Sequence, residues 1–556
     1  MEKIIDENYY DLIVPTSIID IFRSNDNITP INEFYALAHV QKSRPEPCDL
    51  GTYAYHFFPT IFTLESDINL EQSGVEQIQS NPNFGLYGRG IMIGVIDTGI
   101  DYQHPAFRYQ DGSSRILSIW DQTIQDGSAP EGFNYGTEYT QQTINLALKN
   151  PSPLTLVPSV DEIGHGTSIA SIIAGSRNEE GLARGVVPDA DLAIVKLKQA
   201  KRKTRSIHFV KDNAICYQES DIMFAIRYLY ELAATLKRPL ALCIALGSSQ
   251  GPHEGWTATS IYLSYLMQAT KIGIAVSAGN EGNSRRHYYG TIDRNTFFKE
   301  FELRVSNKDL LFPMEIWSNS PSRLSINITS PTGESTQEVY PSFNICRRFD
   351  LIFESSVIWI NNILLEEETG NQLILIRFQT PMEGIWKFRV TNIDRETSNF
   401  NSWLPSGNLI SDETYFTDSN PNITITSPGN STFPLTVSAY NPAIGNILPT
   451  SSRGYTRNNR IKPDVAAPGF ELACAIPNNL YGTMTGTGAA AAFSTGIIAM
   501  VLEWAIILGN QTSLTGKDIT RLLIRGASRT PSLTYPNNIW GYGTINIQGV
   551  FQQLIT

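Results

Sequence analysis

The stretch GRGIMIGVIDTG, residues 88–99, contains a short apolar run, Ile91–Ile96, that ends at the carboxylate of Asp97. A continuous apolar run of this length between glycines is typical of a strand buried on both faces of a parallel sheet. Comparable runs follow at 191–197, 240–247 and 273–280, and helical patterns lie between them at 166–175 and 220–236. Strands that alternate with helices predict an α/β domain built on a parallel sheet.

Three further regions surround this pattern. Residues 1–65 mix short apolar runs with polar connections, which predicts a small α+β unit, and residues 67–79 are predicted to form a helix that leads out of it. From 286 to 426, short β-rich runs alternate with Asn, Ser, Pro and Gly turns, which is typical of a β-sandwich or jelly roll. Strand–helix alternation then resumes. The β region is therefore predicted to be an insertion that divides the α/β domain into 66–285 and 427–556.

Composition and charge limit the classes of function. Of the 556 residues, 41% are hydrophobic and 17% are charged, which suits a globular chain with a large core. The net charge of −12 gives no support to nucleic-acid binding. One basic run, Lys196–Arg205, stands out in this acidic chain, and we interpret it as a solvated loop.

Cysteines and apolar segments bear on the compartment. The five cysteines are odd in number and widely spaced, without a CxxC pair, so we expect neither a zinc site nor a disulfide framework, and a reducing compartment is favoured. The first residues lack the basic-then-apolar pattern of a secretory signal peptide, so we expect synthesis in the cytoplasm. The run Ala489–Leu508 carries one charge, Glu503, and we interpret it as a buried core helix rather than a membrane span.

Two residues are candidates for acid–base chemistry. Asp97 ends a predicted parallel strand, at the sheet edge where such folds collect functional groups, and it could orient a histidine. His165 stands between glycines in DEIGHGTSIASIIAG and could act as a general base near neutral pH. Taken alone, each has an ordinary alternative: Asp before Thr-Gly is often a turn or a helix cap, and the histidine could be a loop residue without a role.

Two further positions could stabilise negative charge. Asn280, in SAGNEGN, follows a predicted strand, and its amide could donate to an oxyanion. Gly488 lies where TGTG enters a helix, so the backbone N–H groups and the helix dipole there would favour a developing negative charge. The ordinary alternatives are a tight turn at Asn280 and a small-residue loop chosen for helix packing at Gly488.

Together and in this order, the four motifs resemble those of subtilisin-type serine proteases, peptidase family S8. That family has the chain order Asp, His, Ser. By this resemblance Asp97 and His165 take the places of the triad Asp and His, and Asn280 that of the oxyanion residue. The segment Ala245-Leu246-Gly247 is similar to the strand that lines the substrate cleft, and KPDVAAPG (462–469) to the loop before the nucleophile.

The resemblance breaks at the nucleophile. Where the family reads Gly-Thr-Ser, this chain reads Gly486-Thr487-Gly488. Ser494 lies nearly two helical turns further along and cannot substitute. Thr485 and Thr487 flank the position, but their backbone places point them elsewhere in such a fold. The site is therefore predicted to lack its attacking oxygen.

Within the family, the chain resembles the clostridial Csp proteins of spore germination and is most similar to a CspC-type pseudoprotease, although His165 is retained. The resemblance implies an uncleaved prodomain, residues 1–65, whose end FFPTIFTLE (57–65) stays in the cleft by strand addition. It also implies a spore-associated regulator of an active Csp protease that activates a cortex hydrolase, and a small-molecule germinant as ligand.

Two other functions stay open at this point. The chain could be an active endopeptidase with a non-standard nucleophile. It could also be a cortex-binding module in which Trp386 and Trp403 stack on sugars, although aromatic residues of this kind are more often buried. No cofactor is predicted. Calcium is common in subtilases, but no acidic loop here is assigned to it.

Overall fold

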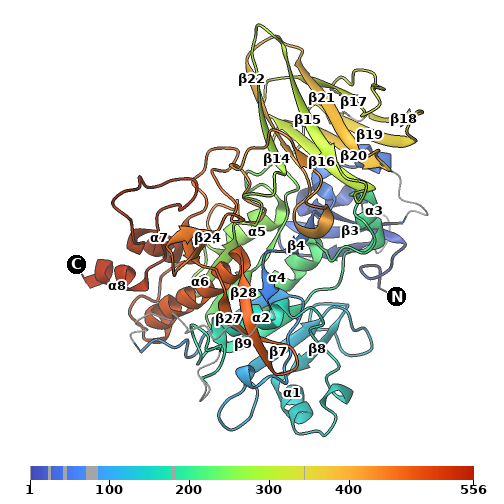
Figure 1. Ribbon diagram of the computed structural model, residues 1–556. Helices are drawn as coiled ribbons and strands as arrows, with labels where there is room; N and C mark the ends of the chain where they lie inside the picture. The colour runs from blue at the N-terminus through green and yellow to red at the C-terminus, as the bar shows by residue number, and fades with distance from the viewer. Residues whose placement is uncertain are drawn as a thin grey trace.

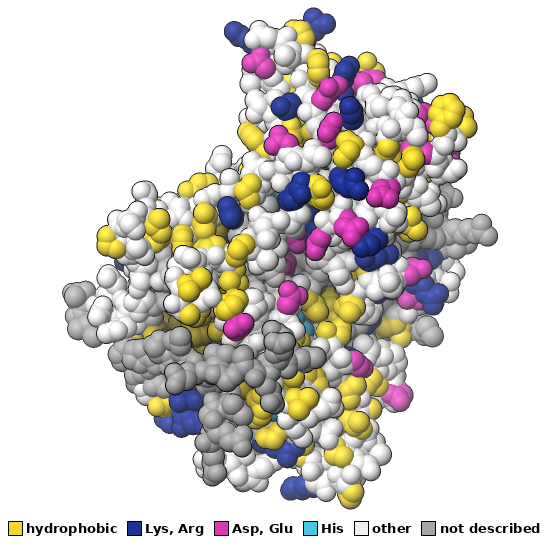
Figure 2. Space-filling view, in the orientation of Figure 1, with side chains coloured by type: hydrophobic (Ala, Val, Ile, Leu, Met, Phe, Trp, Pro, Cys, Tyr) yellow, Lys and Arg dark blue, Asp and Glu magenta, His cyan; other side chains and the backbone are white. Residues whose placement is uncertain are grey.

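The computed structural model describes residues 2–22, 27–41, 47–69, 85–177, 183–343 and 345–555. Figure 1 shows two β-sheets at the top of the molecule and a large sheet with its helices below them. On the face drawn in Figure 2, acidic and basic side chains are interspersed over the upper sheets. The helices are α1 (Gln141–Leu148), α2 (His165–Ala174), α3 (Arg202–Ile207), α4 (Glu219–Thr235), α5 (Ala258–Leu266), α6 (Thr487–Leu502), α7 (Gly516–Gly526) and α8 (Ile547–Ile555).

The central sheet is parallel except at its edges, as the sequence predicts. In the described chain its nine strands follow the order β25-β24-β13-β11-β6-β9-β7-β8, with β26 beside β24. Of the strands described in this sheet, only β8 and β25 pair antiparallel to their neighbours. The strands are β6 (Met92–Asp97), β7 (Ile116–Asp121), β8 (Thr137–Thr140), β9 (Asp191–Lys196), β11 (Leu240–Ile244), β13 (Ile272–Ser277), β24 (Leu435–Asn441), β25 (Asn446–Ile447) and β26 (Val465–Pro468).

Both faces of this sheet are covered by helices. Ile93 and Val95 of β6 pack into a core with residues of α2 and α6, whereas Met92 and Ile96 pack into a second core with α4 and α5. Alternate residues of a strand point to opposite faces. This arrangement explains why the run at 91–96 is apolar throughout rather than alternating.

Helix α6 is the core helix of the domain. Together with the π-helical turn Glu503–Ile507 that follows it, α6 is long and apolar enough to cross a membrane, but 78% of the tested window is buried inside the protein. It packs on β11, β13 and β24. The helix is therefore buried in the core, as the sequence indicates.

Residues 287–416 form two antiparallel sheets around a separate core. The six-stranded sheet has the order β14-β22-β16-β20-β19-β18, and the four-stranded sheet the order β17-β21-β15-β23. Trp386 lies between them and is fully buried. The strands are β14 (His287–Ile292), β15 (Phe298–Val305), β16 (Leu311–Ser318), β17 (Leu324–Thr329), β18 (Cys346–Leu351), β19 (Ser356–Ile363), β20 (Gln372–Gln379), β21 (Gly384–Asn392), β22 (Ser398–Trp403) and β23 (Tyr415–Phe416).

The N-terminal residues cover the outer face of the six-stranded sheet. Strands β1 (Tyr9–Pro15), β2 (Ile28–Pro30) and β3 (Tyr35–Gln41) form a small sheet, and 3-10 helices η1 (Thr16–Phe22), η2 (Pro47–Gly51) and η3 (Tyr55–Phe57) replace the expected α-helices in the part described. Tyr10 and Phe58 pack in one cluster with Trp317 and Trp403. Because Trp386 and Trp403 are 0% and 3% exposed, neither can stack on a sugar.

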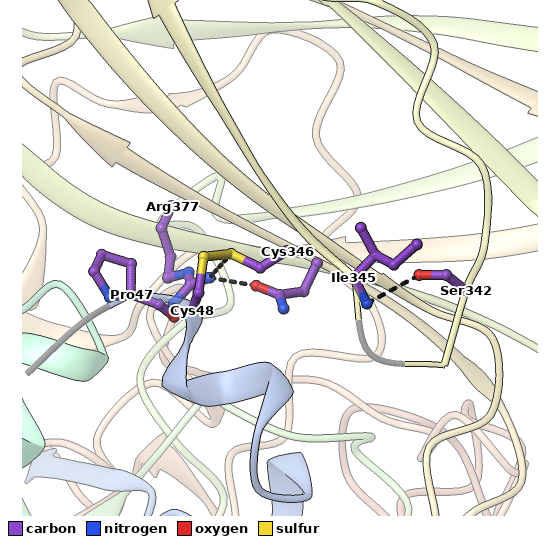
Figure 3. The surroundings of a disulfide bond; sticks show 7 residues. Pro47, Cys48, Ser342, Ile345, Cys346 and Arg377 are labelled. Atoms are coloured by element: carbon purple, nitrogen blue, oxygen red, sulfur yellow. Dashed lines mark hydrogen bonds between the residues drawn. A yellow bond between two sulfur atoms is a disulfide. The ribbon is translucent and has the colours of Figure 1, made fainter.

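Three expectations from the sequence are wrong. The basic run is not a solvated loop: Lys201 is 2% exposed and its Nζ donates to both Asp11 carboxylate oxygens at 2.9 Å, which ties α3 to β1. Residues 67–69 form a strand, β5, rather than the start of a helix, and 70–79 lie outside the described residues. A disulfide also joins Cys48 to Cys346 (Figure 3).

Candidate functional site

Asp97 and His165 form a buried pair at the carboxyl edge of the central sheet. Asp97 is the last residue of β6, and His165 is the first residue of α2. The chain enters α2 through Gly164, whose φ of 86° favours glycine. His165 Nδ1 lies 2.8 and 2.9 Å from the two Asp97 carboxylate oxygens. The carboxylate therefore orients the ring and holds the proton on Nδ1.

The environment of His165 favours its charged form. Burial would lower the pKa of this histidine, but the charge and hydrogen bond of Asp97 raise it above its ordinary value. Nε2 is buried and has no hydrogen-bond partner within the described part of the chain. In a triad this is the atom that takes the proton of the nucleophile.

Asn280 and Gly488 both donate to one backbone oxygen. Asn280 Nδ2 lies 2.6 Å from the carbonyl oxygen of Glu65, and the Gly488 N–H donates to the same oxygen at 2.9 Å. The Asn280 amide is fixed by Thr487, whose N–H and hydroxyl both donate to Asn280 Oδ1 at 3.1 Å. Two fixed donors on one carbonyl oxygen form an oxyanion-hole arrangement, and the Glu65 carbonyl occupies it.

The segment that carries Glu65 runs through the site as extended chain. Strand β4 (Ile61–Leu64) pairs antiparallel with β10 (Tyr217–Gln218) on one side and with β12 (Leu246–Gly247) on the other. The Glu65 N–H donates to the carbonyl oxygen of Ala245 at 3.1 Å. The residues Ala245, Leu246 and Gly247, which the sequence analysis assigned to a cleft, therefore border this segment.

Beyond Glu65 the extended segment continues without a break. Strand β5 (Asp67–Asn69) pairs antiparallel with β28 (Leu480–Thr485), which itself pairs with β27 (Leu472–Ile476). A Cβ added to Gly164 would lie 3.6 Å from Ile68 Cδ1, so the segment passes next to the start of α2 and His165. The peptide bond between Glu65 and Ser66 thus lies at the oxyanion-hole donors with ordered chain on both sides.

Ser66 fills the space in front of Gly488. Its hydroxyl accepts the Ala489 N–H at 2.9 Å and donates to the Glu65 carbonyl oxygen at 2.8 Å. A Cβ added to Gly488 would lie only 2.4 Å from Ser66 Oγ. A side chain at 488 and the observed Ser66 conformation are therefore mutually exclusive. The sequence analysis did not single out Ser66, although it follows the run 57–65 directly.

The other hydroxyls near this point are engaged elsewhere. Thr485 Oγ1 accepts the Glu471 N–H at 2.9 Å, and Ser494 Oγ donates to the Ala490 carbonyl at 2.8 Å. Thr487 contacts Asn280, as described above. None of these hydroxyls bonds to His165 or to the Glu65 carbonyl. Among the described residues, no group of three or more His, Cys, Asp or Glu side chains could hold a metal ion.

The Glu65 side chain is buried between Gly247 and Thr426. It is 2% exposed, and its Oε1 accepts a hydrogen bond from Thr426 Oγ1 at 3.1 Å. A Cβ at Gly247 would lie 1.8 Å from that oxygen, so only glycine permits this approach. Burial, with a smaller effect of Glu281, raises the pKa of Glu65 to about 8. The carboxyl group is therefore mostly neutral at pH 7.

Comparisons with known proteins agree with this geometry. The sequence model of the subtilase family matches residues 88–297 and 402–543. The chain is 32% identical to the intracellular serine protease of Paenibacillus polymyxa over 144 residues, covering 26% of this chain and 34% of that protein. It is 23% identical to the C5a peptidase of Streptococcus pyogenes over 445 residues, covering 74% of this chain and 35% of that protein.

Each of these alignments thus spans about a third of the relative's length. Among solved structures, the CspB protease of Clostridium perfringens matches with a TM-score of 0.76 and 28% identity, covering 85% of this chain and 95% of that one.

Proposed function

Because the chain belongs to the subtilase family, we propose that it is a catalytically inactive, subtilisin-like pseudoprotease that regulates spore germination. In this proposal residues 1–65 are a retained prodomain and residues 286–426 an inserted jelly-roll domain. The observation that carries it is the Glu65 carbonyl oxygen held by both oxyanion-hole donors, next to a residue, Gly488, that has no side chain.

The remaining groups perform only part of a peptidase reaction. Asp97 orients His165 as a base, and Asn280 together with the Gly488 N–H polarises the Glu65 carbonyl. No oxygen at position 488 is present to attack the carbonyl carbon. In subtilisin, a member of the same family, loss of the serine reduces turnover by about 2 × 10⁶, which corresponds to about 9 kcal/mol of barrier. The oxyanion hole and substrate binding alone accelerate hydrolysis by about 10³–10⁴-fold over the reaction in water.

The regulatory role rests on the likeness to the CspB protease and on the occupied cleft. A subtilase body whose cleft is filled by its own chain presents a rigid surface without releasing products. We propose that this surface acts on an active Csp protease, which in turn activates a cortex hydrolase, and that a small-molecule germinant modulates the contact. The protein would then be associated with the spore.

Intact-mass spectrometry and active-site labelling test the loss of catalysis. The purified protein is expected to keep its full mass under reducing conditions, and a serine-directed fluorophosphonate is expected to leave it unlabelled, with subtilisin as the positive control. An adduct on any serine or threonine near Gly488 would instead support an active endopeptidase with a non-standard nucleophile.

The regulatory role needs a separate measurement. Spores that lack this protein are expected to fail to activate their cortex hydrolase on addition of germinant, and a copy carrying His165→Ala is expected to restore activation, because no catalysis is required. Loss of function in His165→Ala spores, with the protein present at normal level, would contradict the proposal.

A further inference from the structure

The disulfide lies between two parts of the chain that are far apart in sequence. Cys48 belongs to η2 and Cys346 begins β18, and they are separated by 298 residues. Both are partly exposed, whereas the free cysteines Cys216, Cys243 and Cys474 are buried. The bond therefore cross-links the N-terminal residues to the six-stranded sheet through two partly exposed residues.

A buried guanidinium lies against this disulfide (Figure 3). Arg377 of β20 is 0% exposed, and its Nη2 donates to Cys346 Sγ at 3.8 Å and to the Asn361 side-chain oxygen. Its Nη1 donates to the Pro47 carbonyl oxygen. These acceptors are all neutral, and Arg377 forms no ion pair with any residue that the structure describes. Burying a cation without a paired anion is costly.

The charged groups around Arg377 do not balance its positive charge. Burial lowers the pKa of Arg377 to about 9, against a weaker opposing effect of Asp49 on η2. On β18 itself, Arg348 is paired with Asp350 at 2.6 Å. A thiolate at Cys346 would supply an anion for Arg377, because its sulfur already accepts a hydrogen bond from Arg377 Nη2.

We propose that Cys48–Cys346 is a thiol–disulfide exchange site, with Arg377 stabilising Cys346 as the leaving thiolate. The thiolate of a small thiol or a dithiol reductase attacks Cys48 Sγ and forms a mixed disulfide. The Cys48–Cys346 bond breaks, and its electron pair stays on Cys346 beside Arg377. A second thiolate then attacks the reductant's sulfur, releasing the oxidised reductant and Cys48, which takes a proton from solvent.

The exchange controls how the N-terminal residues are attached. In the oxidised protein, the disulfide holds the N-terminal residues covalently on the six-stranded sheet. In the reduced protein, only non-covalent contacts hold them, such as the hydrogen bond from the Tyr55 hydroxyl to Glu315 at 2.6 Å and the apolar packing on Trp317. The redox state therefore sets whether the N-terminal residues are held on the six-stranded sheet by a covalent bond or by non-covalent contacts alone.

Two single variants of the full chain measure the thiols separately. Cys48→Ser leaves Cys346 free, and Cys346→Ser leaves Cys48 free. The rate of iodoacetamide alkylation is followed against pH, with peptide mapping to identify the modified cysteine. A positive charge this close lowers the pKa of an acidic group by about 1–3. The pH midpoint of Cys346 alkylation is therefore expected to lie at least about one pH unit below that of Cys48. A Cys346 midpoint equal to or above that of Cys48 would overturn the proposal.

Arginine variants identify the stabilising charge. With Arg377→Gln, alkylation of reduced Cys346 at pH 7 is expected to slow by roughly tenfold or more, and the disulfide to need a more reducing glutathione buffer. Arg377→Lys keeps a positive charge and should retain most of the fast alkylation of Cys346. It is the second variant to measure if Arg377→Gln fails to fold. The control is Arg389→Gln, an exposed arginine paired with Glu300 on the other sheet. Unchanged behaviour in both Arg377 variants, or free Cys48 and Cys346 after equilibration with oxidised glutathione, would refute the assignment.

Discussion

Replacing Gly488 by serine tests whether one added oxygen is enough for cleavage of the Glu65–Ser66 bond. The new Cβ would lie 2.4 Å from Ser66 Oγ and 3.2 Å from Ala245 Cβ, so the Ser66 side chain must rotate away. That rotation leaves the buried Ala489 N–H without its acceptor, at a cost of about 1–3 kcal/mol. Against this, a serine paired with His165 recovers up to about 9 kcal/mol of barrier, judged from subtilisin.

The expected result is therefore self-cleavage after Glu65 in Gly488→Ser. The assay is a reducing gel with intact-mass analysis, because the Cys48–Cys346 disulfide would keep the fragments together without reductant. Cleavage should speed up in Gly488→Ser/Ser66→Ala, which removes the clashing hydroxyl. Gly488→Ala introduces the same Cβ without an oxygen and should stay whole.

One outcome would refute this reasoning. If Gly488→Ser and Gly488→Ser/Ser66→Ala both remain uncut while near-UV circular dichroism shows native packing, then more than the hydroxyl is missing. The base or the oxyanion donors would then not be in working positions in solution.

Three further results are expected. The raised pKa of Glu65 means that its stabilising contribution is complete below pH 4.5, falls as the pH rises, and is lost once the pH has passed about 8. Hydrogen-exchange protection of residues 61–69, corrected for the intrinsic exchange rate, should therefore fall between pH 4.5 and about 8, and Glu65→Gln should remove that fall. Ser66→Ala should lower stability by about 1–2 kcal/mol through loss of the acceptor for the Ala489 N–H, measured by denaturant unfolding, whereas an unchanged midpoint would show that water replaces the hydroxyl. Cys48→Ser should lower the melting temperature, because a cross-link between residues 298 positions apart stabilises the folded state by up to about 5 kcal/mol through the entropy of the unfolded chain. If dithiothreitol leaves the melting temperature of the wild type unchanged, the disulfide makes no such contribution.

The central sheet could be predicted because its signals are local. The run 91–96 is apolar on every residue since both of its faces meet a helix layer, and the strand expected there is observed. Asp97 and His165 could be identified because each stands at the end or start of such an element. The mutual placement of these motifs follows from the fold and not from their spacing in sequence.

The errors share a physical origin in long-range contacts. Lys201 looked solvated because its partner, Asp11, is 190 residues away, and no local pattern announces a buried ion pair. Cys48 and Cys346 are even further apart. Residues 67–69 have a helix-compatible composition, but pairing with β28 makes them a strand. Ser66 acquires its role only through the space that Gly488 leaves.

The extended segment 61–69 is connected to folded protein at both ends, through the N-terminal sheet on one side and β6 on the other. A ligand held by such linkage has an effective concentration of the order of millimolar or more. A free peptide that binds the same groove with micromolar affinity would have to be present far above that affinity to displace it. A partner that binds this protein would therefore have to contact a surface other than this groove.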